Sequence, residues 1–120
     1  KAYGVGIIVA ESTAEKAHEY LYRELDRVRV KGKGAPVTIL EPSGLKEQLP
    51  DEVKQKTEEY RTALLLYRKQ EWDAAREALD DLLEDEPGSL LYELYLERIT
   101  VFRQEPPGEN WDGVFTHETK

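Results

Sequence analysis

Hydrophobic and polar residues alternate strictly along residues 27–31, where Val28 and Val30 fall on one face and basic side chains on the other. Such a period of two predicts a half-buried β-strand. A glycine-rich turn follows, and residues 36–40 carry the β-branched and apolar side chains of a returning strand. Because glycine tolerates a positive φ angle, the turn can be tight. Residues 20–42 therefore predict an antiparallel β-hairpin.

A short run of β-branched and apolar residues at positions 5–10 predicts a buried strand ahead of the hairpin. Ser12 and Glu15 have the three-residue spacing of a capping box, so a short helix is expected at residues 13–19. After the hairpin, the cluster at residues 41–44 contains both proline and glycine. It predicts a break in the chain before a short linker.

From Asp51 onward the apolar spacing changes to three and four residues, which predicts helices separated by breaker residues. Asp51 is itself a suitable N-cap. The first helix is expected to bury one face, formed by Tyr60, Ala63, Leu64 and Tyr67. The second follows residues 69–71, and its apolar face contains Trp72, Ala75, Leu79, Leu82 and Leu83. The third is expected from Ser89, a candidate cap, to Gln104, with a face formed by Leu91, Leu94, Tyr95, Arg98, Ile99 and Phe102.

The first two of these helices together have the length of one tetratricopeptide repeat, which is roughly 34 residues. With Pro87 as the closing proline, Ala63 and Ala75 fall where the helices of such a repeat cross closely. The glycine that usually separates the two helices is replaced by Gln70. We therefore expect a three-helix, tetratricopeptide-like module.

A single repeat leaves its outer apolar face uncovered. The third helix is the expected cover, and Trp111 and Phe115 in the tail are expected to fold back as a further lid. Alternatively, aromatic residues such as Trp72 and Tyr95 form an exposed groove, and the module binds a protein partner or stabilises a dimer. The exposure of these side chains distinguishes a structural cap from an interaction module.

Composition supports a folded protein with two parts. Hydrophobic residues make up 39% and charged residues 35% of the 120 positions, which suits a globular chain. Residues 1–50 carry a net charge of +1 and residues 51–120 a net charge of −9. The acidic second half argues against nucleic-acid binding. We expect an α+β fold with two domains, a partial antiparallel sheet at residues 1–44 and the helical module with its tail at residues 45–120.

The chain contains no cysteine, which excludes a disulfide framework and a thiolate metal site. No stretch approaches about eighteen uninterrupted apolar residues, so no membrane span is expected in this segment. The N-terminus lacks the charged region, apolar core and cleavage site of a signal peptide. The sequence begins without Met and leads directly into a strand, so we expect a portion of a longer protein, and the absence of cysteine fits a cytoplasmic one.

Few polar residues form a recognisable catalytic grouping. His18 and His117 have no partner at metal-ligand spacing, so both are expected to be surface residues. Ser12 and Ser43 lack the sequence context of a nucleophile. The acidic run at residues 80–86 lacks the glycine and the spacing of a calcium loop, so we expect a solvated face there.

Lys31 and Lys33 alternate with glycines at the predicted hairpin tip. Glycine lets backbone N–H groups approach an anion, and lysine supplies a point charge for phosphate. The tip is therefore a candidate phosphate contact, and a phosphate-binding domain in its own right is one possible interpretation.

Two segments of the N-terminal half resemble the catalytic domain of the class III adenylate and guanylate cyclases. Residues 3–13 are similar to its late strand and residues 23–37 to its final hairpin, in which Val30-Lys31-Gly32-Lys33-Gly34 followed by Pro36-Val37 is fairly specific. The helical half resembles the C-terminal region of bacterial cyclases that carry an extracytoplasmic CHASE2 sensor. Its matching motifs are residues 66–68, Trp72, residues 74–75, residues 95–98 and residues 111–115.

The resemblance implies a phosphorus–oxygen lyase of signal transduction that converts ATP, or GTP, to the 3′,5′-cyclic nucleotide and pyrophosphate. It implies a head-to-tail homodimer, two magnesium or manganese ions held by two aspartates, and a triphosphate contact by Lys31 but not by Lys33. The metal aspartates, the base-selecting residues and the transition-state pair of the family have no counterpart in these residues. We therefore expect this segment alone to be inactive and its parent to be a membrane-anchored bacterial protein.

Overall fold

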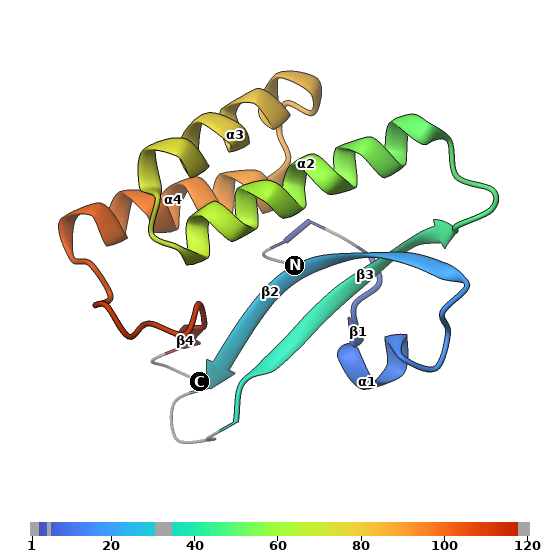
Figure 1. Ribbon diagram of the computed structural model, residues 1–120, viewed down its shortest axis with the longest axis horizontal. Coiled ribbons are helices and arrows are strands. Elements are labelled where there is room, and N and C mark those ends of the chain that lie inside the picture. The colour runs from blue at the N-terminus through green and yellow to red at the C-terminus, as the bar shows by residue number, and fades with distance from the viewer. Residues whose placement is uncertain (1–2, 5, 31–34, 118–120) are drawn as a thin grey trace. The chain divides into compact units, whose positions relative to one another are not determined.

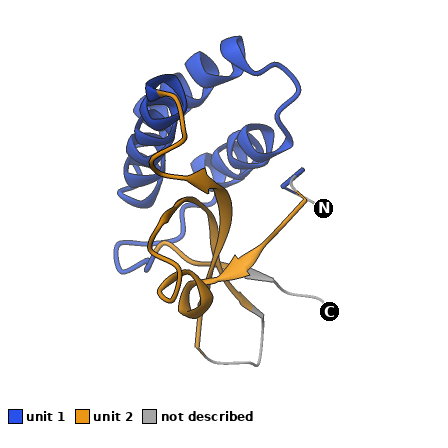
Figure 2. Cartoon of the chain, turned by 90° about the vertical axis from the view of Figure 1, so that its right-hand side faces the viewer, with its two compact units in different colours: residues 1–4, 51–112 blue, residues 5–50, 113–120 orange. Residues whose placement is uncertain are grey.

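The computed structural model describes residues 3–4, 6–30 and 35–117, and Figure 1 shows its helices and strands. The chain forms two compact units, coloured separately in Figure 2. The helical unit comprises Lys1–Gly4 and Asp51–Asp112, and the sheet unit comprises Val5–Pro50 and Gly113–Lys120, each in its described residues. Both helices and strands are present, which confirms the α+β fold class.

A long β-hairpin forms the centre of the sheet unit. Strands β2 (Tyr20–Val30) and β3 (Val37–Leu45) pair antiparallel. Strand β1 (Val9–Ala10) pairs antiparallel with β3, and β4 (Phe115–His117) pairs parallel with β2, so the strand order is β1-β3-β2-β4. The predicted hairpin is confirmed, and its strands are longer than the alternation indicated. The expected antiparallel sheet also gains a parallel strand.

The position of β4 changes the division of the chain. Along the chain, the boundary between the sheet unit and the helices lies after Pro50, whereas the sequence predicted it between residues 44 and 45. The residues from Gly113 belong with the sheet and not, as expected, with the helical module. The reason is the pairing of β4 with β2, since main-chain hydrogen bonds attach this segment to the hairpin.

The predicted break at residues 41–44 is wrong, because this cluster continues β3. The pairing with β2 skips Ser43, which is therefore the extra residue of a β-bulge. Proline is tolerated in a strand beside a bulge, and Pro42 occupies that position. Gly44 on the other side of the bulge has a φ angle of 144°, which side chains other than glycine rarely allow.

The predicted buried strand at residues 5–10 is wrong over most of its length. Only Val9–Ala10 is paired, and the side chains of Ile7 and Ile8 are 63% and 42% exposed. Val5 lies outside the described residues. Because β1 lies at the edge of the sheet, hydrophobicity alone does not bury the residues that precede it.

The first helix, α1, comprises Glu11–Ala14 and not residues 13–19. Its N-cap residue is Ala10, which makes no side-chain capping bond. Because the helix begins immediately after β1, Ser12 lies inside its first turn. The capping-box prediction is therefore wrong.

The helical unit contains α2 (Asp51–Arg68), α3 (Trp72–Asp85) and α4 (Leu90–Gln104), so the three predicted helices are confirmed. Resemblance to a tetratricopeptide repeat stays a prediction. Most of the predicted apolar faces are buried: Tyr60, Ala63, Leu64 and Tyr67 on α2, Ala75, Leu79 and Leu82 on α3, and Leu91, Tyr95 and Ile99 on α4.

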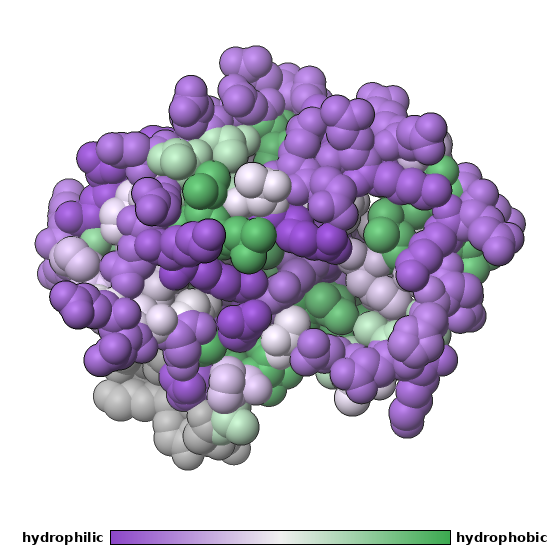
Figure 3. All heavy atoms as spheres, in the orientation of Figure 1, coloured by the Kyte–Doolittle hydropathy of each residue, from purple (hydrophilic) through white to green (hydrophobic). Residues whose placement is uncertain are grey.

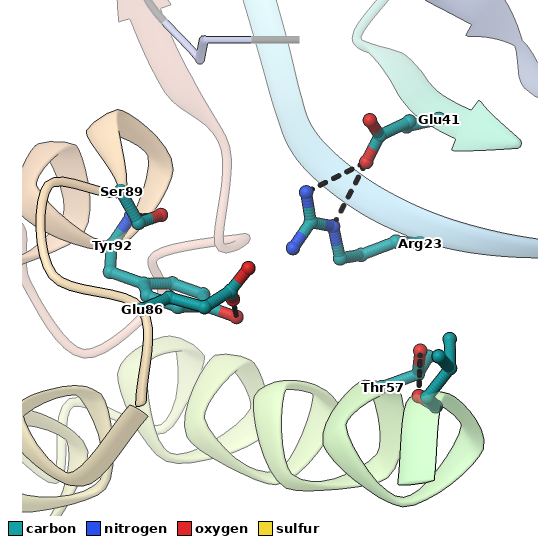
Figure 4. Close-up of polar contacts among 7 residues, drawn as sticks. Arg23, Glu41, Thr57, Glu86, Ser89 and Tyr92 are labelled. Carbon is teal, nitrogen blue, oxygen red and sulfur yellow. Dashed lines mark hydrogen bonds and ion pairs between the residues drawn. The ribbon is translucent and has the colours of Figure 1, made fainter. Parts of the chain in front are cut away.

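Polar contacts fix the start of α4. The Ser89 hydroxyl accepts a hydrogen bond from the Tyr92 backbone N–H at 3.3 Å, which confirms the predicted N-cap (Figure 4). The Tyr92 hydroxyl donates to Glu86 Oε1 at 2.9 Å. Within α2, the Thr57 hydroxyl donates to the carbonyl oxygen of Val53 at 3.0 Å, so this buried side chain has a partner.

The turn between α2 and α3 contains a left-handed residue that is not glycine. Gln70 has a φ angle of 64°, where a Cβ atom costs roughly 1 kcal/mol or more. Its Nε2 atom donates to the carbonyl oxygen of Gly108 at 2.6 Å. The side chain therefore links this turn to the segment that follows α4, at the price of backbone strain.

We expect Gln70→Gly to raise the free energy of unfolding of the helical unit by about 0.5–1 kcal/mol, because relief of the strain outweighs one exposed hydrogen bond. Urea denaturation followed by tryptophan fluorescence measures this change. Gln70→Ala is the matched control, since it loses the hydrogen bond and keeps the strain, and its stability should fall. A less stable Gln70→Gly variant would mean that the bond to Gly108 dominates.

Candidate functional site

The described hairpin leads toward the lysine-containing motif but does not include it. The last pair between its strands joins Val28 and Val37. Residues 31–34 lie outside the described residues. Lys31, the predicted triphosphate contact, and Lys33 both fall in that segment, and the role of Lys31 stays a prediction. The structure instead describes the two-stranded arm that carries them.

An ion pair holds the middle of this arm. Arg23 Nε and Nη2 donate to Glu41 Oε1 at 3.1 and 2.7 Å, from directly paired positions of β2 and β3 (Figure 4). Their side chains are only 20% and 23% exposed. A longer contact, 3.9 Å, joins Arg27 to Glu24 along β2. The Arg23–Glu41 pair is worth on the order of 1 kcal/mol and favours this register of the two strands.

Within the helical unit, an aromatic cluster joins the helices to the segment that follows them. The ring centroid of Tyr67 lies 5.8 Å from that of Trp72, 6.2 Å from Phe102 and 5.4 Å from Trp111. The Trp72 and Phe102 rings stack at 5.5 Å. Aromatic pairs attract at such distances. Trp111 is therefore folded back onto the helices, as predicted.

The exposure of this cluster bears on the choice between a structural cap and a binding groove. Tyr67 and Tyr95 are buried, whereas Trp72, Phe102 and Trp111 are half-buried. Two of these rings are therefore enclosed, and the other three keep part of their surface accessible to solvent. On the face drawn in Figure 3, hydrophobic residues form small separate areas among hydrophilic ones.

Phe115, the other predicted lid residue, belongs to the sheet unit. It belongs to β4, where it pairs with Val28 of β2. The backbone of this segment extends the sheet, which an aromatic residue in a short tail does not reveal, and the role of Phe115 as a lid stays a prediction.

The acidic run of α3 lines a groove between α2 and α3 of about 500 Å³. Lys56 Nζ pairs with Asp85 and lies 3.6 Å from Glu59, while Asp81 and Glu84 also line the groove. The hydrogen bond to Asp85 raises the pKa of Lys56. In the described part of the chain, no group of three or more His, Cys, Asp or Glu residues could hold a metal ion. The groove is therefore acidic, but its described residues do not form a set of metal ligands.

The remaining sequence candidates are dispersed. His18 is exposed in the turn before β2, and Ser12 and Ser43 are exposed on α1 and β3. His117 lies in β4. None of these positions supports a catalytic role beyond what the sequence indicated.

Sequence reasoning missed one residue, Asp26 of β2. Its side chain is 2% exposed, and the neighbouring Leu25 is fully buried. Two consecutive buried residues do not follow the alternation that predicted the strand at residues 27–31. The only signal in the sequence is a carboxylate next to a leucine within a predicted strand, which is not specific.

No protein-family model, no curated protein and no solved structure matches this chain. Among the described residues, no helix has the length and hydrophobicity needed to cross a membrane. Membership of the cyclase family stays a prediction from the sequence motifs.

Proposed function

We propose that this chain is the C-terminal part of a class III nucleotide cyclase, an enzyme that converts ATP to 3′,5′-cyclic AMP and pyrophosphate. The order of the elements supports this proposal. A strand, a short helix and a long hairpin follow one another as β1, α1, β2 and β3. The Val-Lys-Gly-Lys-Gly motif lies between the two paired strands, and this observation carries the proposal.

In this proposal Lys31 contacts the triphosphate in the intact homodimer. A fixed ammonium group near the leaving pyrophosphate stabilises the negative charge that develops there. The paired strands β2 and β3 extend to Val28 and Val37 on either side of the motif that contains Lys31.

The metal ions of the family do not fit the described residues of this chain, which lack a suitable group of carboxylates. We therefore assign no catalytic step to a metal held by this segment. In this proposal the complete enzyme is a membrane-anchored bacterial protein, and this chain is a cytoplasmic portion of it.

The test is Lys31→Ala in the complete enzyme, measured as the rate of cyclic AMP formation at saturating ATP. We expect kcat to fall by more than about tenfold, the effect of one lost charge contact of about 1.4 kcal/mol. Lys33→Ala is the matched control, because it removes the same charge two residues away and should change kcat by less than about threefold. Equal kcat values for the wild type and Lys31→Ala would reject the role of Lys31.

For the helical unit we propose a structural role, as a cap or as an element that stabilises the dimer. The observation that favours it over peptide binding is the packing of Trp111 on Tyr67, Trp72 and Phe102. Trp111 of the same chain packs on these three rings, so a partner that binds their packed faces would have to displace Trp111.

A further inference from the structure

Strand β2 contains a β-bulge at Leu25. The pairing passes from Glu24↔Leu40 directly to Asp26↔Ile39, so Leu25 is the extra residue at this shift of register. An extra residue of this kind turns the strand and changes which side chains share a face. It explains why Leu25 and Asp26, although consecutive, are both buried.

The side chain of Asp26 bonds the backbone at this bulge. Its Oδ1 atom accepts a hydrogen bond from the Arg27 backbone N–H at 2.8 Å. A buried carboxylate is unfavourable unless it is hydrogen-bonded. Asp26 is only 2% exposed, so its carboxylate needs hydrogen-bond donors. The bond stabilises the local backbone conformation that accommodates the extra residue.

The bulge decides the register of the outer half of the hairpin. Beyond it the pairs are Asp26↔Ile39, Arg27↔Thr38 and Val28↔Val37. Loss of the bulge would pair Leu25 with Ile39 instead and shift each later residue of β2 by one. Because side chains alternate between faces, a slip of one residue turns every later side chain to the opposite face.

The inner part of the hairpin is held independently. The Arg23–Glu41 ion pair joins directly opposed residues between the bulge at Leu25 and the one at Ser43. A slip of the outer half would therefore occur at Leu25, where Asp26 acts.

We propose that Asp26 is a positioning residue for the triphosphate contact, because its carboxylate holds the bulge that sets the register of the strands leading to Lys31. This inference rests on the proposed function. Asp26 acts through the backbone of β2 and does not itself meet the nucleotide.

Disulfide trapping in this chain measures the register without any assay of activity. The sequence contains no cysteine, so introduced pairs are the only thiols. Val28→Cys with Val37→Cys reports the described register, and Arg27→Cys with Val37→Cys reports the slipped one. The Arg27 backbone N–H remains in both pairs.

We expect the first pair to cross-link and the second not to do so. Asp26→Leu removes the acceptor Oδ1 and places an apolar side chain in the buried position, so we expect the variant to fold. It should shift the ratio of the two cross-links toward the slipped pair by at least about fivefold. Asp26→Asn retains Oδ1 as an acceptor and should keep the ratio of the wild type.

A double-mutant cycle in the complete enzyme tests whether Asp26 acts through Lys31. Asp26→Leu should lower kcat by about fivefold or more when Lys31 is present and by less than about twofold in the Lys31→Ala background. Asp26→Asn should retain kcat within about twofold. A purely structural role would lower kcat equally in both backgrounds.

The positioning role is overturned if Asp26→Leu leaves the cross-link ratio unchanged, or if its effect on kcat is the same with and without Lys31. If Lys31→Ala alone leaves kcat unchanged, the proposed function fails and the positioning role fails with it. The cross-link ratio then still shows whether Asp26 holds the bulge, so the two failures are distinguishable.

Discussion

Replacement of Tyr67 by alanine is expected to lower the free energy of unfolding of the helical unit by about 3–5 kcal/mol. The Tyr67 side chain is 2% exposed, and its ring lies within 4.8–6.2 Å of the rings of Tyr95, Trp111, Trp72 and Phe102, measured between centroids. Its removal leaves a cavity at the point where the aromatic cluster converges, and the neighbouring rings cannot all move in to fill it.

Guanidinium denaturation followed by fluorescence is suited to this test, because both tryptophans of the chain, Trp72 and Trp111, belong to the cluster. Leu65→Ala is the matched control: Leu65 is on the same helix and 53% exposed, so its replacement should change stability by less than about 0.5 kcal/mol. Similar losses for the two variants would contradict the central position assigned to Tyr67.

Replacement of Ala75 by leucine is expected to destabilise the helical unit by about 1–3 kcal/mol. Ala75 has no exposed surface and lies on the buried face of α3 with Leu79 and Leu82. Three additional carbon atoms at this position must displace the side chains packed around it, or separate α3 from its neighbours. The gain in hydrophobic surface does not offset this strain.

The neighbouring alanine provides the control for Ala75. Ala74 is exposed on the same helix, so Ala74→Leu makes the same chemical change without overpacking and should stay within about 0.5 kcal/mol of the wild type. Thermal unfolding followed by circular dichroism at 222 nm compares the two variants. A neutral effect of Ala75→Leu would mean that the helices do not pack closely at this position.

The helical unit could be predicted largely from the sequence. The spacing of Tyr60, Ala63 and Tyr67 identified the buried face of α2, and Ser89 identified the start of α4. These features depend on residues within one or two helical turns of each other, so local physical chemistry determines them. The return of Trp111 to the helices was also predicted, because a single helical pair leaves apolar surface that needs a cover.

The sheet unit could be predicted only in part. Alternation at residues 27–31 identified the outer half of β2, but the inner half shows no regular period, because a bulge at Leu25 breaks it. Residues 41–44 carry the composition of a turn and nevertheless continue β3 past a second bulge. The candidate site shows the same division: the resemblance points to Lys31, whereas no local pattern points to Asp26.

By itself, the sequence determined the three helices, their buried faces, the α+β class and the presence of a hairpin, since each of these depends on neighbouring residues and their periodicity. Only the tertiary structure decided that β4 joins β2, that Ile7 and Ile8 are exposed, and which residues the hairpin pairs across its two strands. Strand pairing joins residues that are distant in the sequence, and its hydrogen bonds are formed by backbone groups that every residue carries. Side-chain patterns therefore indicate that a strand exists, but the partner and register are determined when the whole unit folds.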